Sequence, residues 1–256
     1  MITTVSDFIE TGNIMIIPLF QNTLKAPNNT TTGLSRSASI TVKSAISSDS
    51  FEGKEGEIMS IWTKECQIIL LGMGGSDKLN TKKSRDIGAK CFSNLPDNLG
   101  KKIVVRFTTG WNTGNMASFA EGIILRNYKF DKYQEKIVDE KQDKEWSMVC
   151  QTTKRNRENL DLEIERLSAI ATGVHLARDL GNEPANRLYP EEFGRRAKDW
   201  AKGKKNVEVE VWDFSRLKEE GMHGLIEVGK GSIHKPCMVF FRLNPNLDTE
   251  KQVPCI

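Results

Sequence analysis

The three histidines of this 256-residue chain are the side chains best suited to bind a metal or to transfer a proton. His175 lies within a long helical pattern, whereas His223 and His234 flank a glycine-rich stretch. None has a second histidine at metal-ligand spacing, and the sequence contains no HExxH motif. We therefore interpret each histidine as a surface or packed residue.

Two further groups combine suitable residue types with suitable spacing. Asp161 and Glu165 lie one helical turn apart and could share a cation, but such a pair is typical of the solvated face of an amphipathic helix. Lys230 stands between two glycines in EVGKGS (227–232), a setting that is also typical of a lysine that contacts a metal or a phosphate. No phosphate-loop spacing surrounds it, so this stretch is predicted to be a turn between a strand and a loop.

The glycines of LLGMGGSDK (70–78) follow an apolar run, which is where a phosphate-binding loop would begin. Their spacing matches neither GxGxxG nor GxxxxGK[ST]. A tight turn between strand and helix is the prediction, with phosphate binding as the alternative.

Composition narrows the class of protein. Apolar residues make up 38% and charged residues 28%, which is typical of a soluble globular protein. The net charge of +3 comes from scattered basic pairs with acidic residues between them, so nucleic-acid binding is not favoured. The N-terminus lacks a signal-peptide pattern, no apolar run is long enough to span a membrane, and none of the five cysteines forms a CxxC pair. These features favour the cytoplasm and no membrane partner.

Alternation of strands and helices predicts a layered α/β domain over residues 1–153. Residues 25–37 are predicted to be a loop, and Gly122 indicates close packing inside its helix. Strands are expected over 13–20, 58–62, 66–75, 102–107 and 146–152, and helices over 80–93 and 118–133.

A second α/β domain is predicted over residues 154–256. It begins with a long connecting helix over 157–181, followed by a helix from Pro190, a strand over 207–212, a helix over 215–221 and a strand over 237–241. Residues 251–256 look like the opening of another apolar strand, so this domain is expected to be incomplete. The buried side of the long helix is predicted to carry Leu160, Ile164, Leu167, Ile170, Ala171, Val174 and Leu180.

Two long segments carry a family resemblance. HLARDLGNEPANRLYPEEF (175–193) and GMHGLIEVGKGSIHKPCMVFF (221–241) resemble the leucyl (cytosol) aminopeptidase family, with weaker similarity at 51–57, 70–75 and 119–133. The resemblance implies a macro-domain-like N-terminal sheet with flanking helices, a connecting helix and a catalytic domain. It also implies a hexameric metallopeptidase that uses two divalent ions, zinc or manganese, to remove N-terminal residues from peptides, with leucine preferred.

In that family the metal ligands are a lysine, aspartates and a glutamate, starting at a second Val-Gly-Lys-Gly that continues into Thr-Phe-Asp. The resemblance places that motif beyond Ile256, and Lys230 belongs to the earlier glycine run. No catalytic or metal-binding residue is therefore assigned to this chain, and its substrate-binding residues are unknown. A fragment that is inactive by itself is expected. Two residues depart from the family pattern. Tyr189 stands where the family often has a threonine that could cap the next helix, and Glu227 stands where a small residue is usual.

Two alternatives are left open. The chain could be a naturally short, non-catalytic relative that acts as a binding or scaffold module. It could also be a ligand-binding macro-like module that takes ADP-ribose at the Gly72–Gly75 turn.

Overall fold

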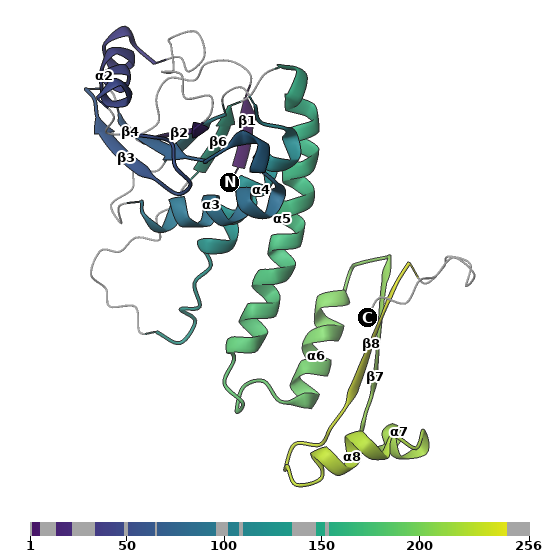
Figure 1. Cartoon of the computed structure of the whole chain (residues 1–256). Helices are drawn as coiled ribbons and strands as arrows, with labels where there is room; N and C mark the ends of the chain where they lie inside the picture. The colour runs from purple at the N-terminus through teal and green to yellow at the C-terminus, as the bar shows by residue number, and fades with distance from the viewer. Residues whose placement is uncertain are drawn as a thin grey trace. The chain divides into compact units, whose positions relative to one another are not determined.

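The computed structural model describes residues 2–5, 14–21, 34–48, 51–64, 66–95, 102–107, 110–134, 147–151 and 154–244. They belong to two compact units, Met1–Arg178 and Asp179–Ile256 (Figure 1). Among these residues we find no helix with the length and hydropathy of a membrane span. The proposed domain division at residue 153 remains a proposal.

A six-stranded sheet forms the centre of the first unit, in the order β1-β6-β5-β2-β4-β3. Its neighbouring strands are parallel except β3, which runs antiparallel to β4. The strands predicted over 13–20, 58–62, 102–107 and 146–152 are confirmed, the one predicted over 66–75 ends at Gly72, and β1 was not predicted. The strands are β1 (Ile2–Val5), β2 (Ile14–Leu19), β3 (Ile58–Trp62), β4 (Gln67–Gly72), β5 (Lys102–Arg106) and β6 (Ser147–Gln151).

Helices cover both faces of this sheet, and each face has its own apolar core. Side chains alternate along β2, so that Ile14 and Ile16 join one core while Met15 and Ile17 join the other. The first core includes residues of α3 (Thr81–Ser93), α4 (Thr113–Arg126) and α5 (Lys154–Asn182); the second includes α2 (Arg36–Ser47). Leu160, Ile164 and Leu167 of the long helix α5 belong to the first core.

Two glycines let α3 and α4 pack closely. A Cβ atom added to Gly88 would lie 2.3 Å from the carbonyl oxygen of Phe119, and one added to Gly122 would lie 2.1 Å from that of Arg85. Arg85 Nε also donates a hydrogen bond to Glu121 Oε2 at 2.6 Å across the same contact. The close packing predicted at Gly122 is confirmed.

Three predictions for this unit need correction. The helix predicted over 118–133 begins at Thr113, where Asn112 caps it, and ends at Arg126. Residues 34–48 contain α2, which begins with the Ser35 hydroxyl accepting the N–H of Ala38, although the sequence to residue 37 favoured a loop; residues 25–33 lie outside the described part. Ile170 is 46% exposed rather than buried.

The second unit contains α6 (Pro190–Ala201), β7 (Val207–Trp212), α7 (Phe214–Glu219), α8 (His223–Gly229) and β8 (Met238–Leu243). β7 and β8 form an antiparallel pair with Val207 opposite Leu243. The prediction of a strand before the turn in EVGKGS is wrong, because α8 runs to Gly229 and the turn follows a helix. The strand predicted over 251–256 lies outside the described residues.

Candidate functional site

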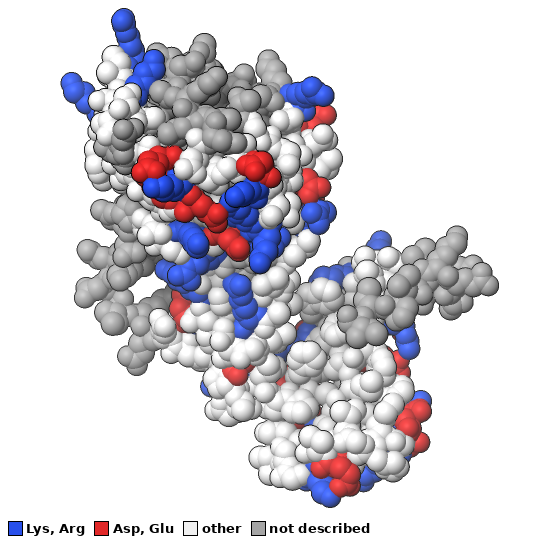
Figure 2. All heavy atoms as spheres, in the orientation of Figure 1, with Lys and Arg blue, Asp and Glu red and all other residues white. Residues whose placement is uncertain are grey.

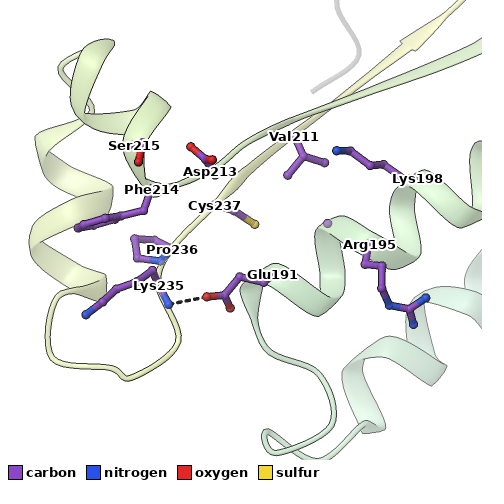
Figure 3. Close-up of a pocket in the computed structure, with 11 residues that line it drawn as sticks. Glu191, Arg195, Lys198, Val211, Asp213, Phe214, Ser215, Lys235, Pro236 and Cys237 are labelled. Atoms are coloured by element: carbon purple, nitrogen blue, oxygen red, sulfur yellow. Dashed lines mark hydrogen bonds between the residues drawn. The ribbon is translucent and has the colours of Figure 1, made fainter.

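A pocket of about 400 Å³ opens in the second unit between α6, the end of β7 and the segment that leads into β8 (Figure 3). Its position follows from the close approach of α6 to the sheet, since a Cβ atom on Gly194 would lie 2.9 Å from Val211. The residues that matter for its chemistry are Glu191, Lys198, Asp213, Phe214, Pro236 and Cys237.

Cys237 is the one thiol on the pocket wall among the described residues. Its Sγ donates a hydrogen bond to the carbonyl oxygen of Pro190 at 3.0 Å. Burial raises the pKa of this thiol, and the nearby Glu191 carboxylate raises it further. The thiol is therefore protonated at neutral pH and is a weak nucleophile.

Several charged groups of the pocket already have protein partners. Glu191 Oε1 accepts the backbone N–H of Lys235 at 2.8 Å, which Figure 3 marks with a dashed line. Asp213 Oδ1 caps α7 by accepting the N–H of Arg216 at 2.9 Å. Arg195 pairs with a carboxylate of its own helix rather than with a group in the pocket. Glu191, Asp213 and Arg195 are thus engaged by the protein itself.

The charges on α6 form a structural network. Glu192 is 2.7 Å from Arg195 and 2.8 Å from Arg196, and Arg196 also contacts Glu183 at 2.9 Å. Hydrogen bonds from Arg195 and Arg196 lower the pKa of Glu192 to about 2. These acids and bases stabilise the helix and its start, and none of them converges on a common point suited to an ion.

The structure separates the three histidines. His175 lies 5.3 Å from the ring of Tyr128, and His234 stacks on Tyr189 with ring centroids 3.9 Å apart. His223 is the first residue of α8 and is exposed. Within the described ranges, no three His, Cys, Asp or Glu side chains gather as a metal site would require.

Asp161, Glu165 and Lys230 lie on the surface. Asp161 and Glu165 are exposed, and Asp161 lies 3.9 Å from Arg157 one turn earlier on α5. Lys230 pairs with Glu227 of α8. A Cβ atom on Gly229 would lie 2.7 Å from the ring of Pro236, which gives a packing reason for the glycine before Lys230.

The Gly72–Gly75 segment is a tight turn and not an open cradle for phosphate. The backbone N–H groups of Gly72, Met73 and Gly74 donate to the carbonyl oxygens of Glu57, Leu19 and Gly53 at 2.8, 2.9 and 2.9 Å. Phosphate loops instead direct such N–H groups at the ligand. Gly74 also has φ +68°, a left-handed conformation that favours glycine.

Acidic and basic side chains are intermixed on the face of the first unit shown in Figure 2. Ion pairs in this unit include Lys54 with Glu52 at 2.5 Å and Lys83 with Glu55 at 2.8 Å. The described residues of this face show no continuous basic stripe of the kind that follows a nucleic-acid backbone.

Sequence reasoning missed the Tyr189–His234 stack and the contact between Gly229 and Pro236. Both join residues that lie apart in the sequence, and neither leaves a periodic signal. The sequence showed that Tyr189 departs from the family pattern, but it did not indicate that His234 is the residue on which it stacks.

Comparison with known proteins gives consistent results. Residues 16–136 match the model of the N-terminal domain of the cytosol aminopeptidase family, and residues 175–256 match the model of its catalytic domain. A probable cytosol aminopeptidase of Clostridium perfringens is 29% identical over 248 residues, which are 93% of this chain and 48% of that protein.

Solved structures share the fold. A mutant of tomato leucine aminopeptidase has a TM-score of 0.78 at 18% identity, covering 96% of this chain and 51% of its own. A bottromycin maturation enzyme in complex with Mn has a TM-score of 0.65 at 17% identity, covering 90% of this chain and 45% of its own. This chain spans between a quarter and a half of the length of the curated relatives it matches, and about half of these two solved structures. The predicted α/β fold is confirmed, and with both domain models matched in order along its length, the chain belongs to the cytosol aminopeptidase family.

Proposed function

We propose that this chain provides the N-terminal domain and the opening of the catalytic domain of a metal-dependent leucyl aminopeptidase. The reaction is removal of the N-terminal residue from a peptide, with leucine preferred. The ordered match of the two domain models is the observation that carries this proposal, because the second of them is the catalytic domain.

Two divalent ions, zinc or manganese, would supply an activated water and hold the substrate. The manganese complex of a structural neighbour supports a divalent metal. The described residues do not fit such a pair of ions, since they contain no group of three suitable ligands. Glu191 and Asp213 are already engaged by backbone N–H groups. No step of hydrolysis is therefore assigned to residues of this chain, and residues 1–256 alone are expected to be inactive.

An assay with leucine p-nitroanilide and added Mn²⁺ tests this expectation. Purified chain 1–256 should give no more turnover than a mock preparation, whereas a metal-loaded family aminopeptidase serves as the positive control. Turnover above the mock value would contradict the expected inactivity. The nucleotide sequence after codon 256 tests the aminopeptidase assignment separately: an open frame that continues into Val-Gly-Lys-Gly supports it, and a stop codon there favours a non-catalytic relative.

The proposal extends to location and assembly. The name of the curated relative and the sequence features support the cytoplasm. The resemblance supports a hexamer for the longer aminopeptidase, assembled chiefly through catalytic domains, so chain 1–256 is expected not to form it. Light scattering that gives the mass of a hexamer would contradict this expectation.

A further inference from the structure

The long helix α5 contacts the first unit at two places along its length. Its N-terminal half contributes Leu167 to the first apolar core, and Ala171, one turn later, is fully buried. Farther along, His175 and Arg178 lie three residues apart on one side of the helix, and both contact Tyr128, which follows α4. These last contacts belong to the motif HLARDLGNEPAN (175–186), for which the proposed function gives no role.

Arg178 binds the C-terminal end of α4. Its Nη1 donates a hydrogen bond to the carbonyl oxygen of Leu125 at 2.8 Å. Leu125 lies in the last turn of α4, where carbonyl groups have no partner within the helix and where a cation is favourable. The guanidinium group also lies 5.4 Å from the centroid of the Tyr128 ring, against which His175 packs at 5.3 Å. Together these contacts anchor α5 to the first unit as far as residue 178.

A second anchor begins directly after α5 ends. The side chain of Glu183 is only 2% exposed, and its Oε1 accepts a hydrogen bond from Arg196 Nη1 of α6 at 2.9 Å. Removing either partner of a buried ion pair is costly, because the other charge is then left uncompensated. The chain turns tightly after this pair, since the N–H groups of Arg187 and Leu188 donate to the carbonyl oxygen of Pro184 at 2.8 and 2.9 Å. Glu183 therefore ties the chain to the second unit.

Residues 179–182 separate the two anchors, and the division between the two compact units falls directly before them. Gly181 lies within this last turn of α5 and does not have a positive φ. A Cβ atom added to it would meet no atom of the described residues within 4 Å. Neither a left-handed conformation nor close packing therefore requires glycine at this position. What glycine does there is weaken the helix relative to alanine.

We propose that residues 179–182 form a hinge at which α5 bends, and that Arg178 and Glu183 are the positioning residues that fix its two ends. Bending there lets the two units reorient while each keeps its own fold. The inference rests on contacts within each unit and does not depend on the proposed peptidase activity.

Backbone amide relaxation, measured by nuclear magnetic resonance in the complete 256-residue chain, tests the hinge. The two units should give different rotational correlation times, because each tumbles partly by itself. Gly181→Ala should reduce that difference and slow amide hydrogen exchange over 179–182 about fivefold, as the helix propensities of glycine and alanine predict. A single correlation time for the unchanged chain would overturn the hinge.

Gly173→Ala is the matched control for Gly181→Ala. Gly173 also lies within α5, and its Cβ position also has no atom of the described residues within 4 Å. It stands between Ala171 and His175, both of which are held to the first unit, so stiffening the helix there should leave the two correlation times unchanged. Equal effects of the two alanine variants on the correlation times would contradict a hinge at 179–182.

Amide hydrogen exchange tests the anchor at Arg178. Arg178→Ala should speed exchange over residues 172–178 about three- to tenfold, because the contacts with the end of α4 and with the Tyr128 ring are lost. Arg178→Lys keeps a cation that can bind the Leu125 carbonyl group and should restore most of the protection. Exchange in β5 should stay unchanged in both variants. Unaltered exchange over 172–178 in Arg178→Ala would overturn the anchor, and so would lost protection of β5, because Arg178 would then stabilise the whole unit.

The anchor at Glu183 is tested in the same way. Glu183→Ala should speed exchange in the first turn of α6, since Arg196 loses its buried partner. Glu163→Ala is the control, because Glu163 pairs with Arg166 on the exposed surface of α5 and should leave α6 unchanged. Unaltered exchange of α6 in Glu183→Ala would contradict the second anchor.

Discussion

The two units of this protein differ in how much of their structure is covered by other parts of the same unit. In the first, helices pack on both faces of a mainly parallel sheet, and Phe119, Ile16 and Leu70 are fully buried. In the second, a two-stranded sheet packs with α6, and the buried residues of 179–244 are Gly194, Ala197 and Leu217. Because an isolated two-stranded sheet is at best marginally stable, the first unit should account for most of the stability.

Exposed large apolar side chains occur in both units, but the two most exposed among the described residues lie in the second. Val228 is 90% exposed, Ile233 89%, Leu243 66% and Phe241 52%. Phe241 and Leu243 alternate along β8 and therefore lie on one face of the strand. The second unit forms helices and strands although few of its described residues are buried. Local sequence signals can therefore specify helices and strands without a large apolar core.

The largest expected difference in stability between the units comes from replacing one phenylalanine in each unit with alanine. Phe119→Ala should lower the free energy of unfolding of the first unit by about 3–5 kcal/mol, because the ring is fully buried and packs edge-on against Phe107 and Trp111. Phe241→Ala should cost less than about 1 kcal/mol, since the ring is 52% exposed. Urea denaturation measures both, and similar costs would break the comparison.

Glycine substitutions should give the next largest effect. Gly122→Ala forces α3 and α4 apart, because the new Cβ atom would lie 2.1 Å from the Arg85 carbonyl oxygen, and should cost about 1–3 kcal/mol. Gly173→Ala on α5 is the matched control, since nothing lies within 4 Å of its Cβ position. That change should stabilise by up to about 1 kcal/mol through helix propensity. Thermal unfolding followed by circular dichroism checks both; stabilisation by Gly122→Ala would contradict the close packing.

Acid should affect the second unit through Glu192. The pKa of this residue is lowered from 4.5 to about 2, so its stabilising contribution is present above pH 4.5 and is lost as the pH falls toward 2. Hydrogen exchange of α6 should therefore quicken over that interval relative to intrinsic rates. Glu192→Gln removes the titrating group and should flatten this dependence. An unchanged dependence in the variant would assign the acid sensitivity to other carboxylates.

Much of the first unit was predictable because its signals are local and strong. Continuous apolar runs located β2, β4 and β5, and helical spacing located α3. α2 was not predicted because RSASITVKSAIS is rich in serine and β-branched residues, which favour helices weakly. Its helix is fixed by the Ser35 cap and by burial of Ala38 and Val42 against the sheet, and burial is a tertiary effect.

Less of the candidate site could be predicted from the sequence. The sequence indicated a glycine turn around Lys230 but assigned a strand before it, because EVG carries no period that separates a short helix from a strand. The pocket beside Cys237 depends on α6, the end of β7 and the start of β8 meeting in space. The spacing of residues within a single segment does not indicate that these three segments lie together in space.

The sequence by itself determined the alternation of strands and helices, the turn after β4 and the resemblance that the domain matches bear out. Periodicity, glycine positions and motif order are all properties of the linear chain. Tertiary structure alone decided the order of the strands, the carbonyl groups that Gly88 and Gly122 pack against, and the stack of Tyr189 on His234. These features arise from contacts between residues far apart in sequence, whose geometry is set by packing and not by local preference.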